Sequence, residues 1–321
     1  MSVLKGIGLS LALSLSCSVA VAQDYPTQPI MLVNPYAAGG PADVVARALA
    51  RELEKQLGRA VVVENKPGGG ASIGTGLVAR AKPDGYTLLL GTSAAHVVTP
   101  LMQKTPYDGV SDFDFVAIVA NQPNMVVVNP KVGVKTLAEL IDKARSAPGK
   151  INYASAGPGS SPHLGGELFR QRANIDIVHI PYSGAAPAIN DLVGGQVDMA
   201  LLNLSASLPF IKDKRLIPLA YAAKKRSPLL PDVPTLEESG VKGAESASWY
   251  SLAAPKGTPP AVIEKLNKAV ATINKDDRYK QLMDAQGVEV LTQSAADATA
   301  FVNKDREAMK VLAKSAGLVQ Q

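Results

Sequence analysis

Residues 30–50, IMLVNPYAAGGPADVVARALA, determine how the rest of the chain is expected to fold. A short apolar run leads into a loop that contains Gly39 and Gly40, and the loop leads into a helix that starts at Pro41. The first turn of a helix has N–H groups without intrahelical partners, so a loop of this kind favours an anion. The stretch therefore predicts a strand, a loop and a helix that bind a ligand at the carboxyl end of the strand, as open α/β sheets do.

The first 22 residues have the pattern of an export signal. One basic residue, Lys5, precedes an apolar and serine-rich run, and Ala20-Val21-Ala22 is a small-residue cleavage pattern. The apolar run is too short for a membrane span. We therefore predict cleavage after Ala22 and export to the periplasm. The alternative, lipid attachment at Cys17, lacks the leucine and the small residues that usually precede such a cysteine.

The mature chain is expected to be weakly basic. The sequence has 33 Lys and Arg against 28 Asp and Glu, and loss of Lys5 lowers the formal charge from 33 − 28 = +5 to 32 − 28 = +4. These charges are scattered and aromatic residues make up only 5% of the chain, so binding of nucleic acid is not expected. The only cysteine leaves with the signal, so the mature chain is expected to have no disulfide.

Strand and helix patterns alternate along the mature chain, which predicts βαβ units. Residues 113–130, FDFVAIVANQPNMVVVNP, instead contain two apolar runs with no helix between them. We expect a long extended passage there that crosses between two domains near Asn121, and a return of the chain near Lys224. The predicted division is a signal at 1–22, a first domain at 23–121 and 224–321, and a second domain at 122–223.

Residues 151–169, INYASAGPGSSPHLGGELF, repeat the design of the opening stretch. A strand enters a loop of glycine and serine, and a helix begins near Pro162. Two such loops from two domains could face each other across a cleft and hold a carboxylate between them. The alternative is that their serines only cap helices. His163 is either a neighbour of the cap or a ligand contact, and the sequence leaves both open.

Motifs for nucleotide binding are incomplete. Gly69 and Gly74 have the spacing of a P-loop, but Thr75 and Gly76 stand where Lys and Ser or Thr are needed to reach phosphate and magnesium. The loop at residues 39–40 lacks the three-glycine spacing of a dinucleotide fingerprint. We therefore expect no nucleotide cofactor.

Motifs for catalysis are also incomplete. The three histidines, His96, His163 and His179, lie far apart in sequence without the partners of a zinc site, so no metal is expected. His179 lies within a predicted strand and is expected to pack in the core. No serine has the flanking glycines of a nucleophile elbow. Binding without catalysis is favoured over the alternative, a periplasmic hydrolase with a serine nucleophile near Gly157.

Six segments, taken in order, resemble the tripartite tricarboxylate transporter substrate receptors, also called Bug receptors. They begin at residues 35, 61, 152, 178, 225 and 254 and read PYAAGGPADVVARALA, VVVENKPGGGASIGTGLVARAKPDGYTLLLGTS, NYASAGPGSSPHLGGELF, VHIPYSGAAPAINDLVGGQVDM, KRSPLLPDVPTLEESG and APKGTPPAVIEKLN. The resemblance covers essentially the whole mature chain. It implies an α/β fold of the class II solute-binding (Venus flytrap) type, in which each of two lobes is a mixed sheet flanked by helices.

The resemblance also implies a function. Such receptors bind a small mono- or dicarboxylate between their lobes and deliver it to membrane permease subunits, and a monomer without cofactor is expected here. The alternatives with the same fold are a receptor for an ABC permease and a sensory protein.

The resemblance implies which residues bind the ligand. The expected gripping residues are Tyr36, Ala38, Gly39, Gly40 and Asp43 in the first domain, and Ser155, Ala156, Gly157, Ser160 and Ser161 in the second, with Ser93, Tyr182, Gly184 and Asn203 as wall residues. His163 is a further candidate because of its place beside the serine-rich loop, not because of the resemblance. For Asp43, the default interpretation is a capping role at the amino end of the helix, where a carboxylate interacts favourably with the helix dipole. Leu202 is a departure, because many relatives carry Asp there, and it implies a less acidic cleft.

Overall fold

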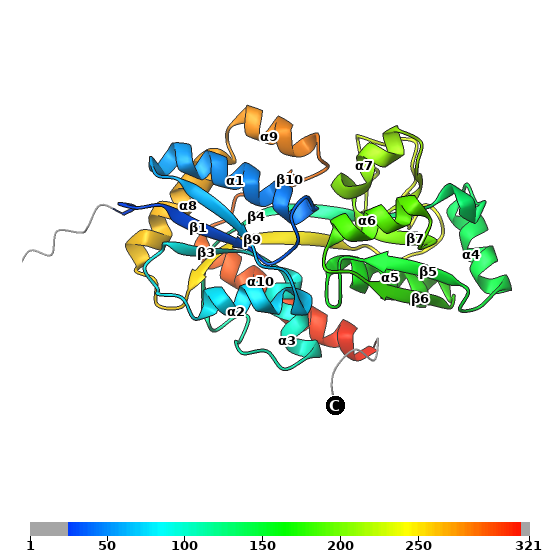
Figure 1. Cartoon of the computed structure of the whole chain (residues 1–321), viewed down its shortest axis with the longest axis horizontal. Helices are drawn as coiled ribbons and strands as arrows, with labels where there is room; N and C mark the ends of the chain where they lie inside the picture. The colour runs from blue at the N-terminus through cyan, green and yellow to red at the C-terminus, as the bar shows by residue number, and fades with distance from the viewer. Residues whose placement is uncertain (1–24, 316–321) are drawn as a thin grey trace, which may run out of the picture.

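The computed structural model describes residues 25–315 (Figure 1). The predicted export signal and its cleavage site lie outside these residues. Within the described range, none of the helices has the length and apolar character needed to cross a membrane.

One mixed sheet extends through both lobes in the order β2-β1-β3-β9-β4-β7-β5-β6, and β8 and β10 pair with β4 (Figure 1). β1 pairs in parallel with β2 and β3, and β5 pairs in parallel with β6 and β7, while β9 and β4 are antiparallel to their neighbours. The strands are β1 Ile30–Asn34, β2 Val61–Asn65, β3 Thr87–Thr92, β4 Phe113–Val128, β5 Ile151–Ser155, β6 Ile177–Pro181, β7 Met199–Asn203, β8 Ile217–Tyr221, β9 Ala247–Pro255 and β10 Glu289–Val290.

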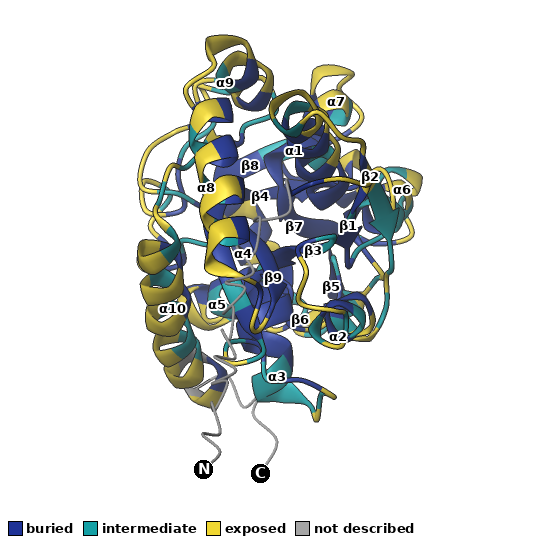
Figure 2. Cartoon of the chain, turned by 90° about the vertical axis from the view of Figure 1, so that its left-hand side faces the viewer, coloured by how far each residue is buried: buried dark blue, intermediate teal, exposed yellow. Residues whose placement is uncertain are grey.

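Helices cover both faces of the sheet. In Figure 2, α8 and α10 expose one side and turn the other toward the buried strands. The α-helices are α1 Pro41–Leu57, α2 Ser72–Ala79, α3 Thr99–Met102, α4 Leu137–Ser146, α5 Ser161–Ala173, α6 Ala185–Gly194, α7 Leu204–Lys212, α8 Pro260–Ile273, α9 Asp277–Asp284 and α10 Ala295–Ser315. Two 3-10 turns, η1 Gly69–Ala71 and η3 Pro130–Val132, and a π-helical turn, η2 Ala94–Val98, complete the helical elements.

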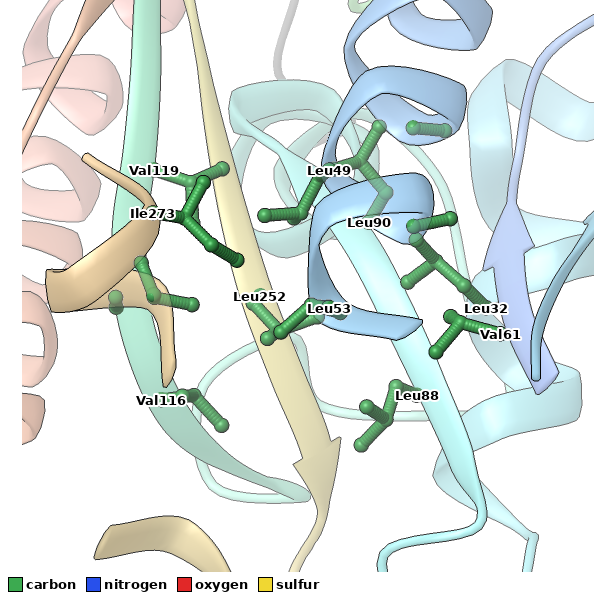
Figure 3. Packing of buried hydrophobic residues seen from close by; sticks show 14 of the residues in the cluster. Leu32, Leu49, Leu53, Val61, Leu88, Leu90, Val116, Val119, Leu252 and Ile273 are labelled. Atoms are coloured by element: carbon green, nitrogen blue, oxygen red, sulfur yellow. The ribbon is translucent and has the colours of Figure 1, made fainter. Parts of the chain in front are cut away.

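The core of the first lobe forms between α1 and the strands. Leu49 and Leu53 project from the helix onto the strands that carry Leu90 and Leu252, and all four side chains are fully buried (Figure 3). Their helical spacing is the apolar face that the sequence shows. Truncation of one such leucine to alanine typically costs 2–5 kcal/mol. α1 ends where Gly58 adopts the left-handed conformation, with φ +67°. This packing holds α1 against the sheet, so that the helix begins near the carboxyl end of β1.

β4 is the long extended passage that the sequence predicts. Its first part pairs with β9 as far as Pro123, opposite Ala247. Its last five residues pair with β7, and the last four of these also pair with β8. Asn124 is the first residue of β4 that pairs with β7, opposite Asn203. We therefore propose that the chain first crosses between the lobes at residues 123–124.

For the return crossing, which the sequence predicts near Lys224, the packing supports a later position. Leu236, Val241 and Ala244 are buried in the core of the second lobe. The Ser246 N–H donates to the Ala222 carbonyl, 3.0 Å away, and β9 then re-enters the first lobe. We propose a division in which residues 224–245 belong to the second lobe, because their apolar side chains pack there.

Candidate functional site

A small cavity lies between the two lobes. Its walls come from the loop before α1, the turn after β3, the loop before α5, the start of α6 and the strands β7 and β9. The lining residues are Tyr36, Ala37, Gly40, Pro41, Ala42, Thr92, Ser93, Ala94, Ala156, Ser160, Ser161, Pro162, Ala185, Asn203, Ser248 and Tyr250. None of these described wall residues has a charged side chain.

Three helices begin at the cavity wall. α1 contributes Ala42 from its first turn, α5 contributes Ser161, and α6 contributes Ala185. The N-caps of α1 and α6 are Gly40 and Gly184, and neither helix has a side-chain hydrogen bond at its cap. Their first-turn amides therefore lack both intrahelical and capping partners and can bind a ligand. Helix amino ends carry partial positive charge, so this uncharged cavity is suited to an anion.

Two phenols lie on the cavity wall. The Tyr36 hydroxyl lies 3.2 Å from Thr92 Oγ1, and burial raises the pKa of Tyr36 to about 12, against a smaller lowering effect of that hydrogen bond. Burial also raises the pKa of Tyr250 well above its usual range. Both phenols are protonated at neutral pH, but the Tyr250 hydroxyl already donates to Gln122 Oε1 at 3.4 Å.

The lobes are in close contact around the cavity. A Cβ atom added to Gly184 would lie 3.3 Å from Ala37 Cβ. One added to Gly70 would lie 2.8 Å from the Pro158 carbonyl oxygen, which is closer than real Cβ atoms approach. Glycine at these positions therefore permits the approach of the lobes, and the structure represents a closed arrangement.

Asp43 organises the first loop and is not among the wall residues. Its carboxylate accepts from the Gly39 N–H at 3.0 Å, from Arg47 Nε at 2.8 Å and from Asn65 Nδ2 at 3.0 Å. Burial favours the neutral acid, but these hydrogen bonds outweigh it and lower the pKa of Asp43. The Gly39 amide already has a partner in Asp43. These contacts agree with the structural role that is the default interpretation of Asp43.

Serine hydroxyls hold the second loop. Ser160 caps α5, since its Oγ accepts from the His163 N–H at 3.3 Å and donates to the Gly157 carbonyl at 2.7 Å. Ser155 Oγ accepts from the Gly157 N–H at 3.1 Å and lies 2.7 Å from His179 Nε2. These bonds shape the loop behind the cavity wall, and Ser160 also lines the cavity.

His163 and His179 pack behind this loop. The prediction that His179 packs in the core is wrong, because its side chain is only half-buried and its Nε2 lies beside Ser155 Oγ. Their rings stack with centroids 4.1 Å apart, and the Gly159 N–H donates to His163 Nδ1 at 3.1 Å. Burial lowers the pKa of both residues, that of His179 to about 4. Both imidazoles are therefore neutral, and His163 is the neighbour of the cap rather than a wall residue. In the range 25–315, no group of three His, Cys, Asp or Glu side chains is placed to hold a metal ion.

A set of amides joins the cavity to the crossing strands. Asn203 Nδ2 donates to the Gln122 carbonyl at 3.0 Å and to Asn124 Oδ1 at 2.9 Å. Asn124 Nδ2 donates to Ser161 Oγ and to Ser246 Oγ, both at 2.9 Å. These bonds connect β4, β7, α5 and the return segment at the point where the chain passes between lobes.

The structure brings only part of the expected site together. The expected residues that line the cavity are Tyr36, Gly40, Ser93, Ala156, Ser160, Ser161 and Asn203, and those outside its wall are Ala38, Gly39, Asp43, Ser155, Gly157, His163, Tyr182 and Gly184. The Tyr182 hydroxyl donates to Asp191 Oδ2 at 2.7 Å instead. Leu202 is buried with Met125 in the second-lobe core, so this departure changes the core rather than the cavity wall.

Several residues that line the cavity were not expected from the sequence. Thr92 lies one residue before the expected Ser93, and Ala185 directly follows the expected Gly184. Ser248 and Tyr250 come from β9, where the alternation of a strand places residues two apart on one face. That alternation was the available signal, but it does not show which face of β9 meets the cavity.

Comparisons with known proteins point to one class. The family model described as tripartite tricarboxylate transporter family receptor matches residues 45–318. The chain is similar to BugT of Bordetella pertussis (strain Tohama I), with 36% identity over 302 residues, which are 94% of this chain and 93% of BugT. It is similar to an R. palustris protein solved with adipate, with 35% identity and a TM-score of 0.90 over 92% of this chain and 99% of that one. It is also similar to MatC from Rhodopseudomonas palustris with bound malate, with 30% identity and a TM-score of 0.85 over 90% and 99% of the two chains.

Proposed function

Because the chain belongs to the tripartite tricarboxylate transporter receptor family, we propose that it is an extracytoplasmic receptor that binds a small mono- or dicarboxylate between its lobes and delivers it to membrane permease subunits. The family consists of receptors rather than enzymes. The ligand, the delivery and the partner are the parts that we propose for this chain.

One observation carries the ligand class. The amino ends of α1, α5 and α6 meet at a cavity whose described walls have no charged side chain. Amides and hydroxyls at helix amino ends stabilise a carboxylate by hydrogen bonds and by the helix dipole. The relatives solved with adipate and malate support the same class, since both ligands are small dicarboxylates.

Titration calorimetry on the chain that starts at Gln23 tests this proposal. We expect heat of binding, with one site per chain, for at least one member of a panel of small mono- and dicarboxylates. The same ligand at about one hundred times its Kd should add about 2.7 kcal/mol to the free energy of unfolding. Binding of sugars or neutral amides alone, with none of the carboxylates, would contradict the proposed ligand class.

The proposal also covers the cellular location and the oligomeric state of the protein. The Ala20-Val21-Ala22 pattern supports cleavage before Gln23 and release into the periplasm as a monomer. The cavity is formed by one chain, so binding needs no second copy. The intact mass of periplasmic material should equal that of residues 23–321, and light scattering should give the same mass. A lipidated Cys17 at a new amino terminus, or a stable dimer, would contradict this part.

A further inference from the structure

Ser93 stands on the cavity wall with its hydroxyl proton already in use. Its Oγ donates to Asp305 Oδ2 at 2.9 Å, and the indole Nε1 of Trp249 donates to the same oxygen at 3.1 Å. An indole N–H only donates, so this carboxylate oxygen acts as an acceptor. The Ser93 proton therefore lies on the Asp305 side. Toward the cavity, Ser93 Oγ can therefore only accept a hydrogen bond.

Asp305 reaches this position from the C-terminal helix. It lies in a crevice beside the cavity, together with Ser93, Trp249 and Met309. The described residues that line this crevice include no lysine or arginine. Burial raises the pKa of Asp305, although the hydrogen bonds from Ser93 and Trp249 oppose the rise. Asp305 thus has hydroxyl and indole donors in place of a cationic partner, and its link to the cavity passes through Ser93.

Ser161, on the opposite lobe, has the reverse polarity. The Gln122 carbonyl only accepts, so it fixes the Asn203 amide with its N–H groups toward Gln122 and toward Asn124 Oδ1. This orientation turns Asn124 Nδ2 to Ser161 Oγ, 2.9 Å away. Ser161 accepts that bond and keeps its own proton free for the cavity. The two serines therefore present a donor on one lobe and an acceptor on the other.

We propose that Ser93, positioned by Asp305, is the specificity-determining acceptor of the cavity and selects small carboxylates that also carry a hydrogen-bond donor, such as a hydroxyl or ammonium group. The inference rests on the proposed carboxylate function and adds the polarity of a second group on the ligand. A ligand without such a donor leaves the Ser93 lone pair unpaired once water is expelled. Sites built for a ligand hydroxyl discriminate strongly against analogues that lack it.

Calorimetry with matched ligand pairs tests the proposal. The probes are succinate with malate, and butanoate with 3-hydroxybutanoate, since the members of each pair differ by one hydroxyl. For the wild-type chain from Gln23, we expect the hydroxylated member to bind about five- to tenfold more tightly, the value of one neutral hydrogen bond. Equal affinities within both pairs would overturn the inference.

Three variants separate the role of Asp305 from a structural effect. Ser93→Ala removes the acceptor, and Asp305→Ala releases the serine proton toward the cavity. Both should reduce the affinity ratio within a pair to about one. Asp305→Asn should keep the wild-type ratio, because the Trp249 N–H holds the amide oxygen in the place of Oδ2.

The readout is the ratio of affinities, which a general loss of stability does not change. Should Asp305→Ala fail to fold, the contrast between Ser93→Ala and Asp305→Asn decides. A wild-type ratio in Ser93→Ala overturns the inference and leaves the carboxylate function intact. No binding of any carboxylate to the wild type overturns the proposed function, and the inference with it.

Discussion

Gly40 shows how closely the lobes approach at the scale of one residue. Its φ of −86° is accessible to any residue. A Cβ at this position would lie 3.7 Å from the Ala37 carbonyl oxygen and 3.9 Å from Ala185 Cβ of the second lobe, which are ordinary contacts. There is room for a methyl group, but a longer side chain must enter the cavity or push against the start of α6.

We therefore predict that Gly40→Leu lowers the affinity for every carboxylate by at least about tenfold, because the leucine side chain obstructs the part of the cavity in which the shared carboxylate group is proposed to bind. Gly40→Ala is the matched control and should bind within about threefold of wild type. Calorimetry measures both affinities, and urea unfolding checks that both variants fold. Unchanged affinity in Gly40→Leu would show that the ligand does not use this part of the cavity.

Ser160 gives a prediction of the opposite kind. Its hydroxyl caps α5 through the His163 N–H and donates to the Gly157 carbonyl. Ser160→Ala should therefore lower the free energy of unfolding by about 1 kcal/mol, the usual value of an N-cap. Ligand affinity should change less, because the hydroxyl proton is not free for the ligand. A large loss of affinity at unchanged stability in urea would contradict this assignment.

Residue roles were only partly predictable from the sequence. The glycine- and serine-rich loops located the cavity, because strand-to-helix loops at the carboxyl ends of strands bind ligands. Which amide or hydroxyl is already occupied depends on side chains elsewhere in the fold. Asp43 accepts a hydrogen bond from the Gly39 amide, and Asp305 accepts one from the Ser93 hydroxyl. Neither hydrogen bond can be predicted from the order of residues in the sequence.

At the scale of elements, the loop before α5 depends on neutral imidazoles. His163 Nδ1 accepts from the Gly159 N–H, and a protonated imidazole cannot accept that bond. Burial lowers the pKa of His163, and it lowers the pKa of His179 and of the core residue His96 to about 4. The unfolded chain, with histidine near pH 6.5, binds these protons first. Stability is therefore complete above about pH 6.5 and falls as the pH falls toward 4.

Urea unfolding between pH 7.5 and 4.5 measures this effect. The free energy of unfolding should decrease steadily below about pH 6.5, with a similar slope m at each pH. His179→Gln should make the decrease shallower, because it removes one of the three groups. A wild-type stability that stays flat from pH 7 to pH 4.5 would contradict neutral buried histidines.

Most elements follow from the sequence, and the exceptions have physical reasons. Pro209 lies inside α7 and argues against a helix there, but the helix forms against the core through Leu204 and Leu208. Thr235 and Glu238 have the spacing of a helix capping box and make both of its hydrogen bonds, at 2.7 and 3.1 Å, but no helix begins there. β10 has two residues and no periodicity to detect.

At the scale of the molecule, the predicted two-lobed α/β fold is confirmed by its likeness to solved periplasmic binding proteins of the same family. The sequence predicts a first crossing near Asn121 because 113–130 lacks a helix, and β4 is continuous there. It predicts the return near Lys224 because the basic and proline-containing segment at 224–228 has the composition of a linker, and we propose a later return. Only tertiary packing shows that the residues after it, such as Leu236 and Val241, belong to the core of the second lobe.

Under the proposed function, we expect the ligand to favour closure of the lobes. Residues from both lobes form the cavity, so its hydrogen bonds to a ligand are complete only when the lobes meet. A ligand that binds the closed state more tightly shifts the population toward it. The change should take place at the two crossings, near Asn124 and Ser246.

Small-angle X-ray scattering of the chain from Gln23, with and without a saturating carboxylate identified by calorimetry, distinguishes a receptor that closes from one that does not. We expect the ligand to lower the radius of gyration and to bring the scattering curve to that calculated from the closed structure. We also expect Gly40→Leu to stay expanded at the same ligand concentration. Identical curves for the wild type with and without bound carboxylate, both matching an open molecule, would contradict a receptor that closes over its ligand.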